Sequence, residues 1–205
     1  MRNPNPNIKP LIKEKALELL MNKNPEQIGM RDIANECKIT ATSIYHYYKD
    51  KDKLFQEISL DCLYQLNERI KAAANNASAG SSTTSPSSKA QIRKAISAFR
   101  DWCFENPRRA LLVMQGIKSA EDATPEIIEE YYACNRTGEE LLKKAVAANE
   151  AKSENPRLDV GLLVSGLWGC IESVLLKKAD VEYWEKGVTF TDAFIELWIN
   201  SIFVK

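Results

Sequence analysis

The chain has 205 residues, 44% of them hydrophobic, and carries 28 basic and 28 acidic side chains. A chain of this length buries most of its unfolded surface in one or two domains without help from disulfides or metals. The zero formal net charge excludes a protein that coats nucleic acid or acidic lipid with a global positive field, but it leaves room for a local basic patch.

Several functional classes find no support in the sequence. No apolar run approaches the roughly 20 residues of a membrane span, and the N-terminal segment MRNPNPNIKP lacks the apolar core of a signal peptide, so we expect a cytoplasmic protein. Five cysteines without a CxxC spacing argue against a disulfide framework or a zinc site. His46 is the only histidine and no glycine-rich phosphate loop is present, so we predict no enzyme, no metal and no cofactor.

The N-terminal quarter predicts four helices in succession. Apolar residues at helical spacing indicate a first helix over 8–23, and a short helix follows Gly29. Thr40 is a good N-cap for a second short helix. A longer helix, with one apolar stripe, begins at about residue 50 and ends near Ala74.

The composition then changes to a serine- and threonine-rich stretch at about residues 75–89, which predicts a flexible loop. Helical patterns resume after it, and alternating strand patterns are missing. The expected helices cover residues 92–105, 107–114, 124–149, 158–178 and 189–203, the last opened by a capping box at Thr189–Asp192. The chain is therefore predicted to be all-α, with about nine helices.

The segment Ile33–Tyr48 fits two short helices that cross steeply through a tight turn. Ala34 supplies the small residue for the crossing, Lys38 ends the turn, and Ile44 anchors the second helix. The outward face that remains is almost entirely neutral: Thr40, Ala41, Thr42, Ser43, Tyr45, His46 and Tyr47. A face meant only for solvent usually carries Glu and Lys, whereas hydrogen-bonding side chains of this kind suit base edges and phosphates.

Residues Ile28–Ala34 and Ile39–Leu54 resemble the TetR family of bacterial transcriptional regulators, and the similarity extends over about Ile8 to Leu54. The shared features are a short helix ending in Ile-Ala, a turn, and a second helix with a tyrosine, an aromatic residue and a lysine in series. Two positions depart from the family pattern, because Lys38 and Thr42 stand where the family usually or often has glycine. A non-glycine residue at position 38 must accept a positive φ or shift the turn.

The resemblance implies a three-helix helix-turn-helix DNA-binding domain over residues 1–55, and a helical-bundle domain over 56–205 that binds an effector and dimerises. It implies that Thr40, Thr42, Tyr45 and His46 lie in the groove with Thr42 and its neighbours facing bases, while Ser43, Tyr45, Tyr47 and Lys51 are placed for phosphates. The candidate DNA contacts are Arg31, Thr40, Ala41, Thr42, Ser43, Tyr45, His46, Tyr47, Lys49 and Lys51.

A homodimer follows from the charge distribution as well as from the resemblance. Residues 1–60 carry ten basic and eight acidic side chains, a net of +2, so a single copy would bind DNA weakly. Two copies would read a pseudo-palindromic operator with half-sites about one helical turn apart, or a multiple of it. The last two helices show apolar residues on two faces, which predicts a second copy as partner. The expected interface residues are Gly161, Ser165, Gly169, Phe194, Ile195, Trp198, Ile199 and Ile202.

The resemblance also implies an effector pocket among the middle helices, for an apolar or aromatic small molecule. Its candidate lining residues are Phe99, Trp102, Met114, Tyr131, Tyr132 and Trp168. The function expected is that of a one-component regulator, most simply a repressor, which binds its operator as a dimer and is released by the effector. The alternative is a helical DNA-binding or interaction protein of the same fold without an effector.

Overall fold

The computed structural model describes residues 7–76, 87–116 and 123–203. Within these ranges the chain is helical, with no strand beyond one isolated bridge between Ala151 and Phe203. The helices are α1 (Ile8–Asn22), the 3-10 turn η1 (Pro25–Gln27), α2 (Met30–Glu36), α3 (Ala41–Ile44), α4 (Lys51–Asn76), α5 (Ser88–Glu105), α6 (Pro107–Met114), α7 (Pro125–Tyr131), α8 (Ala133–Ala147), α9 (Pro156–Leu175), α10 (Val181–Glu185) and α11 (Gly187–Ile202). The predicted all-α fold is confirmed.

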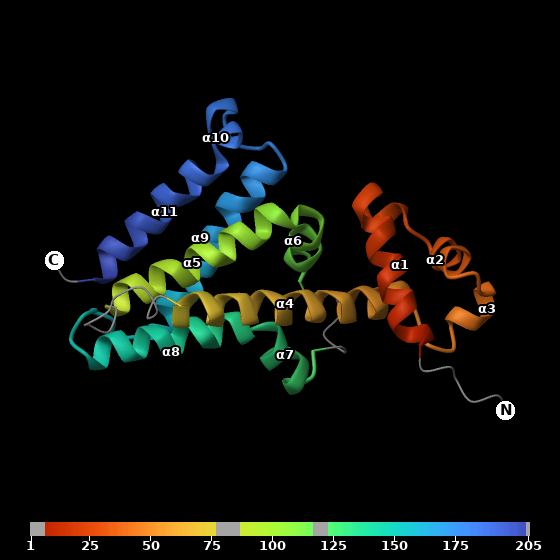
Figure 1. The fold of residues 1–205 in the computed structure, drawn as a ribbon, viewed down its shortest axis with the longest axis horizontal. Helices are drawn as coiled ribbons and strands as arrows, with labels where there is room; N and C mark the ends of the chain where they lie inside the picture. The colour runs from red at the N-terminus through yellow and green to blue at the C-terminus, as the bar shows by residue number, and fades with distance from the viewer. Residues whose placement is uncertain (1–6, 77–86, 117–122, 204–205) are drawn as a thin grey trace.

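Helix α4 connects the two parts of the molecule. Figure 1 shows it running from the small N-terminal unit of α1–α3 into a bundle formed by the later helices. It packs against α1 at one end and against α5, α6, α7 and α8 along the rest of its length. The domain boundary expected near residue 55 therefore falls inside one continuous helix, and motion of α4 would carry the N-terminal unit with it.

Local side chains cap several helices; the starts at Thr40 and Thr124 were predicted correctly, whereas α9 starts at Pro156 and not at Leu158 as expected. Thr40 accepts a hydrogen bond from the backbone N–H of Ser43, Thr124 accepts one from Ile127, and Asn155 accepts one from Leu158. Each cap satisfies a backbone donor that the first helical turn leaves without a partner.

Two predicted helices were wrong in extent. The helix expected over 124–149 is broken at Tyr132, whose backbone leaves the helical region and separates α7 from α8. The capping box expected at Thr189–Asp192 does not begin the last helix, because α11 already starts at Gly187. The hydroxyl of Thr191 instead donates to the carbonyl oxygens of Gly187 and Val188 inside α11.

The serine- and threonine-rich loop expected at about residues 75–89 lies mostly outside the described residues. Asn75 and Asn76 belong to the end of α4, and Ser88 and Lys89 belong to the start of α5. The hydroxyl of Ser87 caps α5 by accepting a hydrogen bond from the N–H of Ala90.

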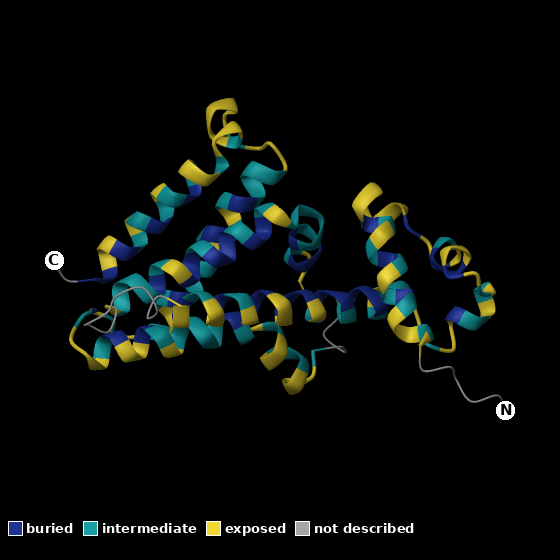
Figure 2. Cartoon of the chain, in the orientation of Figure 1, coloured by how far each residue is buried: buried dark blue, intermediate teal, exposed yellow. Residues whose placement is uncertain are grey.

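Buried side chains form a line along α4 and between the bundle helices (Figure 2). Helix α9 is long and apolar enough to cross a membrane by length and composition. The expectation that no apolar run approaches the length of a membrane span was therefore wrong for this helix. It packs against α5, α8 and α11, and a core helix of a soluble protein passes the same test. Only 28% of its most apolar window is buried, so α9 presents apolar surface that this single chain does not cover.

Candidate nucleic-acid interface and effector pocket

The turn between α2 and α3 has the geometry expected from the sequence. Lys38 takes a left-handed backbone conformation with φ of 55°. The N–H of Ile39 then donates to the carbonyl oxygen of Ala34 over 3.0 Å, which closes the turn. Ala34 is fully buried at the crossing, where a larger side chain would separate the helices. Lys38 thus accepts the positive φ that glycine adopts more easily.

Helix α3 and the turns that follow it present most of the predicted outward face to solvent. Ile44 and Tyr48 are buried beneath it. On the outer side, Thr40, Thr42, Tyr45 and His46 are exposed, while Ala41, Ser43 and Tyr47 are half-buried. The surface proposed for DNA is therefore accessible; which bases or phosphates these residues contact stays a prediction.

Two of the polar groups on this face already have an intramolecular role. The hydroxyls of Thr40 and Ser43 share a hydrogen bond of 2.8 Å, and Thr40 Oγ1 also caps α3. Side chains held in this way stabilise the helix start and have fewer free groups for base recognition. Thr42, Tyr45 and His46 are the residues of this face best able to reach base edges.

The N-terminus of α4 is less suited to phosphate than the sequence indicated. The carboxylate of Asp50 accepts a hydrogen bond of 2.8 Å from the N–H of Lys53, so an anion already occupies this helix end. The ammonium group of Lys51 donates to the carbonyl oxygen of Pro25 over 3.0 Å. Lys49 and Arg31 are exposed and remain candidate phosphate contacts by charge and position.

A partly exposed polar network joins the segment after α3 to α1 and α4. Tyr48 donates its hydroxyl to Glu57 over 3.2 Å, and Lys9 donates to the same carboxylate over 2.9 Å. The ammonium of Lys9 also lies 5.1 Å from the centre of the Tyr48 ring. Burial and the neighbouring Glu57 charge raise the pKa of Tyr48, so its hydroxyl stays protonated and keeps donating. Side-chain contacts thus join the recognition surface to the first and fourth helices.

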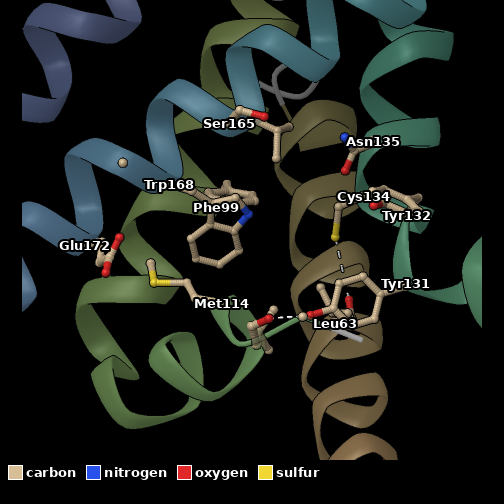
Figure 3. Close-up of a pocket in the computed structure, with 14 residues that line it drawn as sticks. Leu63, Phe99, Met114, Tyr131, Tyr132, Cys134, Asn135, Ser165, Trp168 and Glu172 are labelled. Atoms are coloured by element: carbon tan, nitrogen blue, oxygen red, sulfur yellow. Dashed lines mark hydrogen bonds between the residues drawn. The ribbon is translucent and has the colours of Figure 1, made fainter. Parts of the chain in front are cut away.

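A cavity of about 420 Å³ opens inside the bundle (Figure 3). Phe99 and Trp168 lie edge to face at its centre, with ring centroids 4.7 Å apart. Tyr131 donates its hydroxyl to the carbonyl oxygen of Val113, and burial raises its pKa to about 12. Burial likewise raises the pKa of the Cys134 thiol to about 12. The volume falls within the range typical of small-molecule sites.

Five of the six residues predicted for the pocket line this cavity: Phe99, Met114, Tyr131, Tyr132 and Trp168. Trp102 does not line it and is buried in the core. The other lining residues were not predicted for the pocket: Leu63, Val113, Gly116, Cys134, Asn135, Val164, Ser165, Gly169 and Glu172. They come from α4, from α6 and the residues after it, and from α8 and α9, and no spacing along the chain relates them.

One face of α9 is open. Gly161, Ser165 and Gly169 share it, and a side chain built at either glycine would meet no neighbouring atom within 4 Å. Leu158 and Leu162 lie on the same face and are exposed, Leu162 by 61%. These two leucines were not predicted, although their positions out of phase with the buried stripe were a usable signal.

Helix α11 packs its other predicted residues inward. The chain's own core buries Ile195, Ile199 and Ile202. These three residues are therefore not available to a second copy, and they are removed from the expected interface. Phe194 packs closely over Gly166 of α9, and Trp198 donates its indole N–H to the carbonyl oxygen of Asp159 over 3.2 Å. The exposed large apolar residues of α11 are Leu197, at 73%, and Val188 near its start.

The arrangement is that of a helix-turn-helix protein in which one long helix joins the DNA-binding unit to a helical bundle with an internal cavity. Residues 12–58 match the family described as bacterial regulatory proteins, tetR family. No curated protein matches this sequence.

Solved structures with the same fold match over nearly the whole chain. A TetR-family transcription regulator from Shewanella sp. PV-4 has 18% identity and a TM-score of 0.68, covering 96% of this chain and 98% of its own. A regulatory protein of the same family from Rhodococcus RHA1 has 16% identity and a TM-score of 0.66, covering 96% and 97%. The fatty acid degradation regulator FadR from Bacillus halodurans has 13% identity and a TM-score of 0.67, covering 97% of each chain. The chain therefore matches the tetR family model over its N-terminal helices, and as a whole it has the fold of these solved TetR-family regulators.

Proposed function

We propose that the protein is a cytoplasmic one-component repressor that acts by binding DNA and not by catalysis. Two copies bind a pseudo-palindromic operator, and a small molecule in the bundle cavity releases them. The observation that carries DNA binding is the exposed neutral face of α3, which the Tyr48–Glu57–Lys9 network joins to α1 and α4.

The dimer is supported by the open face of α9. Leu158 and Leu162 are exposed beside the small residues Gly161, Ser165 and Gly169, which allow another helix to approach closely. With a local net charge of +2, a single N-terminal unit offers little electrostatic affinity for DNA. A second copy on the α9 face, with α11 contributing Leu197, supplies the second recognition surface.

The effector role is supported by the cavity and by its position. Met114 of α6 lines the cavity, and α6 also packs against α1 of the DNA-binding unit. A ligand that displaces α6 would therefore shift the spacing of the two recognition surfaces and lower operator affinity. The alternative, a regulator without an effector, would have led us to expect a filled bundle core.

Selection of bound sites from random duplexes tests the proposal. The full chain is expected to enrich a pseudo-palindrome with two copies bound per site. Tyr45→Ala should lose sequence-specific binding by about tenfold or more, as one good base contact contributes about 1–3 kcal/mol. Tyr64→Ala, which removes an exposed tyrosine from α4, is the matched control and should bind normally. Enrichment of no motif, or an unaffected Tyr45→Ala variant, would contradict the assignment.

A further inference from the structure

The charge of the cavity wall restricts its ligand. Of the described residues that line the cavity, Glu172 is the only one with a charged side chain, and none is Lys, Arg or His. The remaining polar groups are neutral: the hydroxyls of Tyr131 and Tyr132, the Asn135 amide, the Ser165 hydroxyl and the Trp168 indole N–H. The raised pKa values of Tyr131 and Cys134 keep both groups uncharged near neutral pH.

The polar groups stand at two separate sides of the cavity. Figure 3 shows Glu172 and Met114 on one side and Tyr132 and Asn135 on the other, with the Phe99 and Trp168 rings between them. The Glu172 carboxylate accepts a hydrogen bond from Lys178 over 3.0 Å, and its side chain is partly exposed. A ligand that fills the cavity therefore contacts aromatic faces in the middle, neutral donors and acceptors at one end and a carboxylate at the other.

Two cations lie near the cavity without lining it. Arg157 lies in an adjoining groove that shares Tyr132, Asn135 and Ser165 with the cavity, and Lys178 donates to the Glu172 carboxylate. Neither cation is among the described residues that line the cavity itself.

We propose that the cavity takes an uncharged or cationic aromatic molecule and rejects organic anions such as carboxylates and phosphates. This proposal rests on the proposed function, since it names the chemical class of that effector. An anion would lose its hydration without gaining a paired cation, which is costly. An ammonium group would instead meet aromatic faces, which attract cations, and would compete with Lys178 for the Glu172 carboxylate.

Three naphthalene derivatives of matched shape test the proposal: 1-naphthalenemethanol, 1-naphthylmethylamine and 1-naphthoate. Their affinities for the full chain are measured by titration calorimetry at pH 7 without DNA. The alcohol and the amine are expected to bind about tenfold more tightly than naphthoate, or better. Naphthoate binding as tightly as the alcohol would overturn the proposal, and so would the absence of binding by all three.

Two variants locate the binding. Tyr132→Ala should weaken the alcohol and the amine several-fold, whereas Tyr183→Ala, which removes a similarly exposed tyrosine from α10, should not. Glu172→Gln should weaken the amine and leave the alcohol unchanged. Equal effects of the two tyrosine variants, or an unchanged amine affinity in Glu172→Gln, would refute the assigned site. Operator binding is measured separately. A chain that shows this charge preference but selects no operator would contradict the proposed function and leave the ligand class of the cavity unaffected.

Discussion

The guanidinium Nη1 of Arg108 donates a hydrogen bond to Asn24 Oδ1 over 3.0 Å. Asn24 precedes η1 in the DNA-binding unit, and Arg108 lies in the first turn of α6, which lines the cavity through Met114. This contact links the two parts of the molecule directly, besides the connection through α4. It lies on the path along which a displaced α6 would move the recognition surface.

We predict that Arg108→Ala lowers operator affinity several-fold and leaves the free energy of unfolding within about 1 kcal/mol of the parent, since exposed polar contacts stabilise little. The DNA-binding unit loses a contact that restricts its orientation, so more conformations compete with the bound one. Arg109→Ala is the matched control, because Arg109 donates to Gln65 of α4 within the bundle. Fluorescence anisotropy on the selected operator and urea denaturation give the two quantities; equal operator affinities for both variants would argue against a coupling role for Arg108.

The turn residue gives a stability prediction. Lys38→Gly should raise the free energy of unfolding by up to about 1 kcal/mol, because glycine adopts the positive φ without steric cost. Lys38→Val should lower it by about 1–2 kcal/mol, since a β-branched side chain fits this conformation poorly. Urea denaturation monitored by circular dichroism measures both. Lys49→Gly and Lys49→Val are the controls, because Lys49 has no positive φ. If the glycine variant were again more stable than the parent and the valine variant less stable, the effect would not come from the turn.

The dimer prediction concerns two exposed leucines. Leu162→Glu and Leu197→Glu should each shift the protein towards a single copy, because a charge would be buried against the second copy without a partner. Leu176→Glu, at an exposed leucine just beyond the end of α9, should leave the mass unchanged. Light scattering after size-exclusion chromatography determines the mass. A dimer retained by both the Leu162 and Leu197 variants would remove the proposed interface.

Alkaline pH should destabilise the protein partly through Tyr131. Burial raises the pKa of this phenol to about 12, while an unfolded tyrosine titrates near 10. Between these values the unfolded state loses the proton and the folded state keeps it, so stability present below pH 10 falls as pH rises. Tyr131→Phe should show a smaller fall over this interval in urea denaturation, and Tyr132→Phe, at a half-exposed ring, should follow the parent. Identical pH profiles for Tyr131→Phe and the parent would contradict this account.

The features predicted correctly are local in the chain. Thr40 and Thr124 cap helices through contacts three residues away, and Pro107 begins α6 where its missing N–H is not needed. The break at Tyr132 was missed because the helical pattern of apolar residues continues through it. The start of α11 was missed because Thr191 can serve either as a cap or, as here, as a donor to the preceding turn.

In the candidate site, too, the local features were predicted and the features that depend on packing were not. The outward face of α3 follows from the helix period once Ile44 and Tyr48 are recognised as anchors, and its exposure was predicted. The roles of Thr40 and Ser43 changed, because their mutual hydrogen bond depends on the side-chain conformations. For the interface, an apolar pattern could not tell the buried Ile195 and Ile199 from the exposed Leu197 of the same helix.

Amino-acid order alone determined the all-helical class, most helix ends, and the helix-turn-helix with its unusual Lys38, since each depends on interactions within a few residues. Only tertiary packing decided which aromatic rings line the cavity and which are buried elsewhere in the core. Trp168 lines the cavity, whereas Trp102 is buried away from it. Packing also brought Glu172 to the cavity wall, where it is the one charged side chain among the described lining residues. Such features join helices distant in the sequence, and burial depends on every neighbour at once.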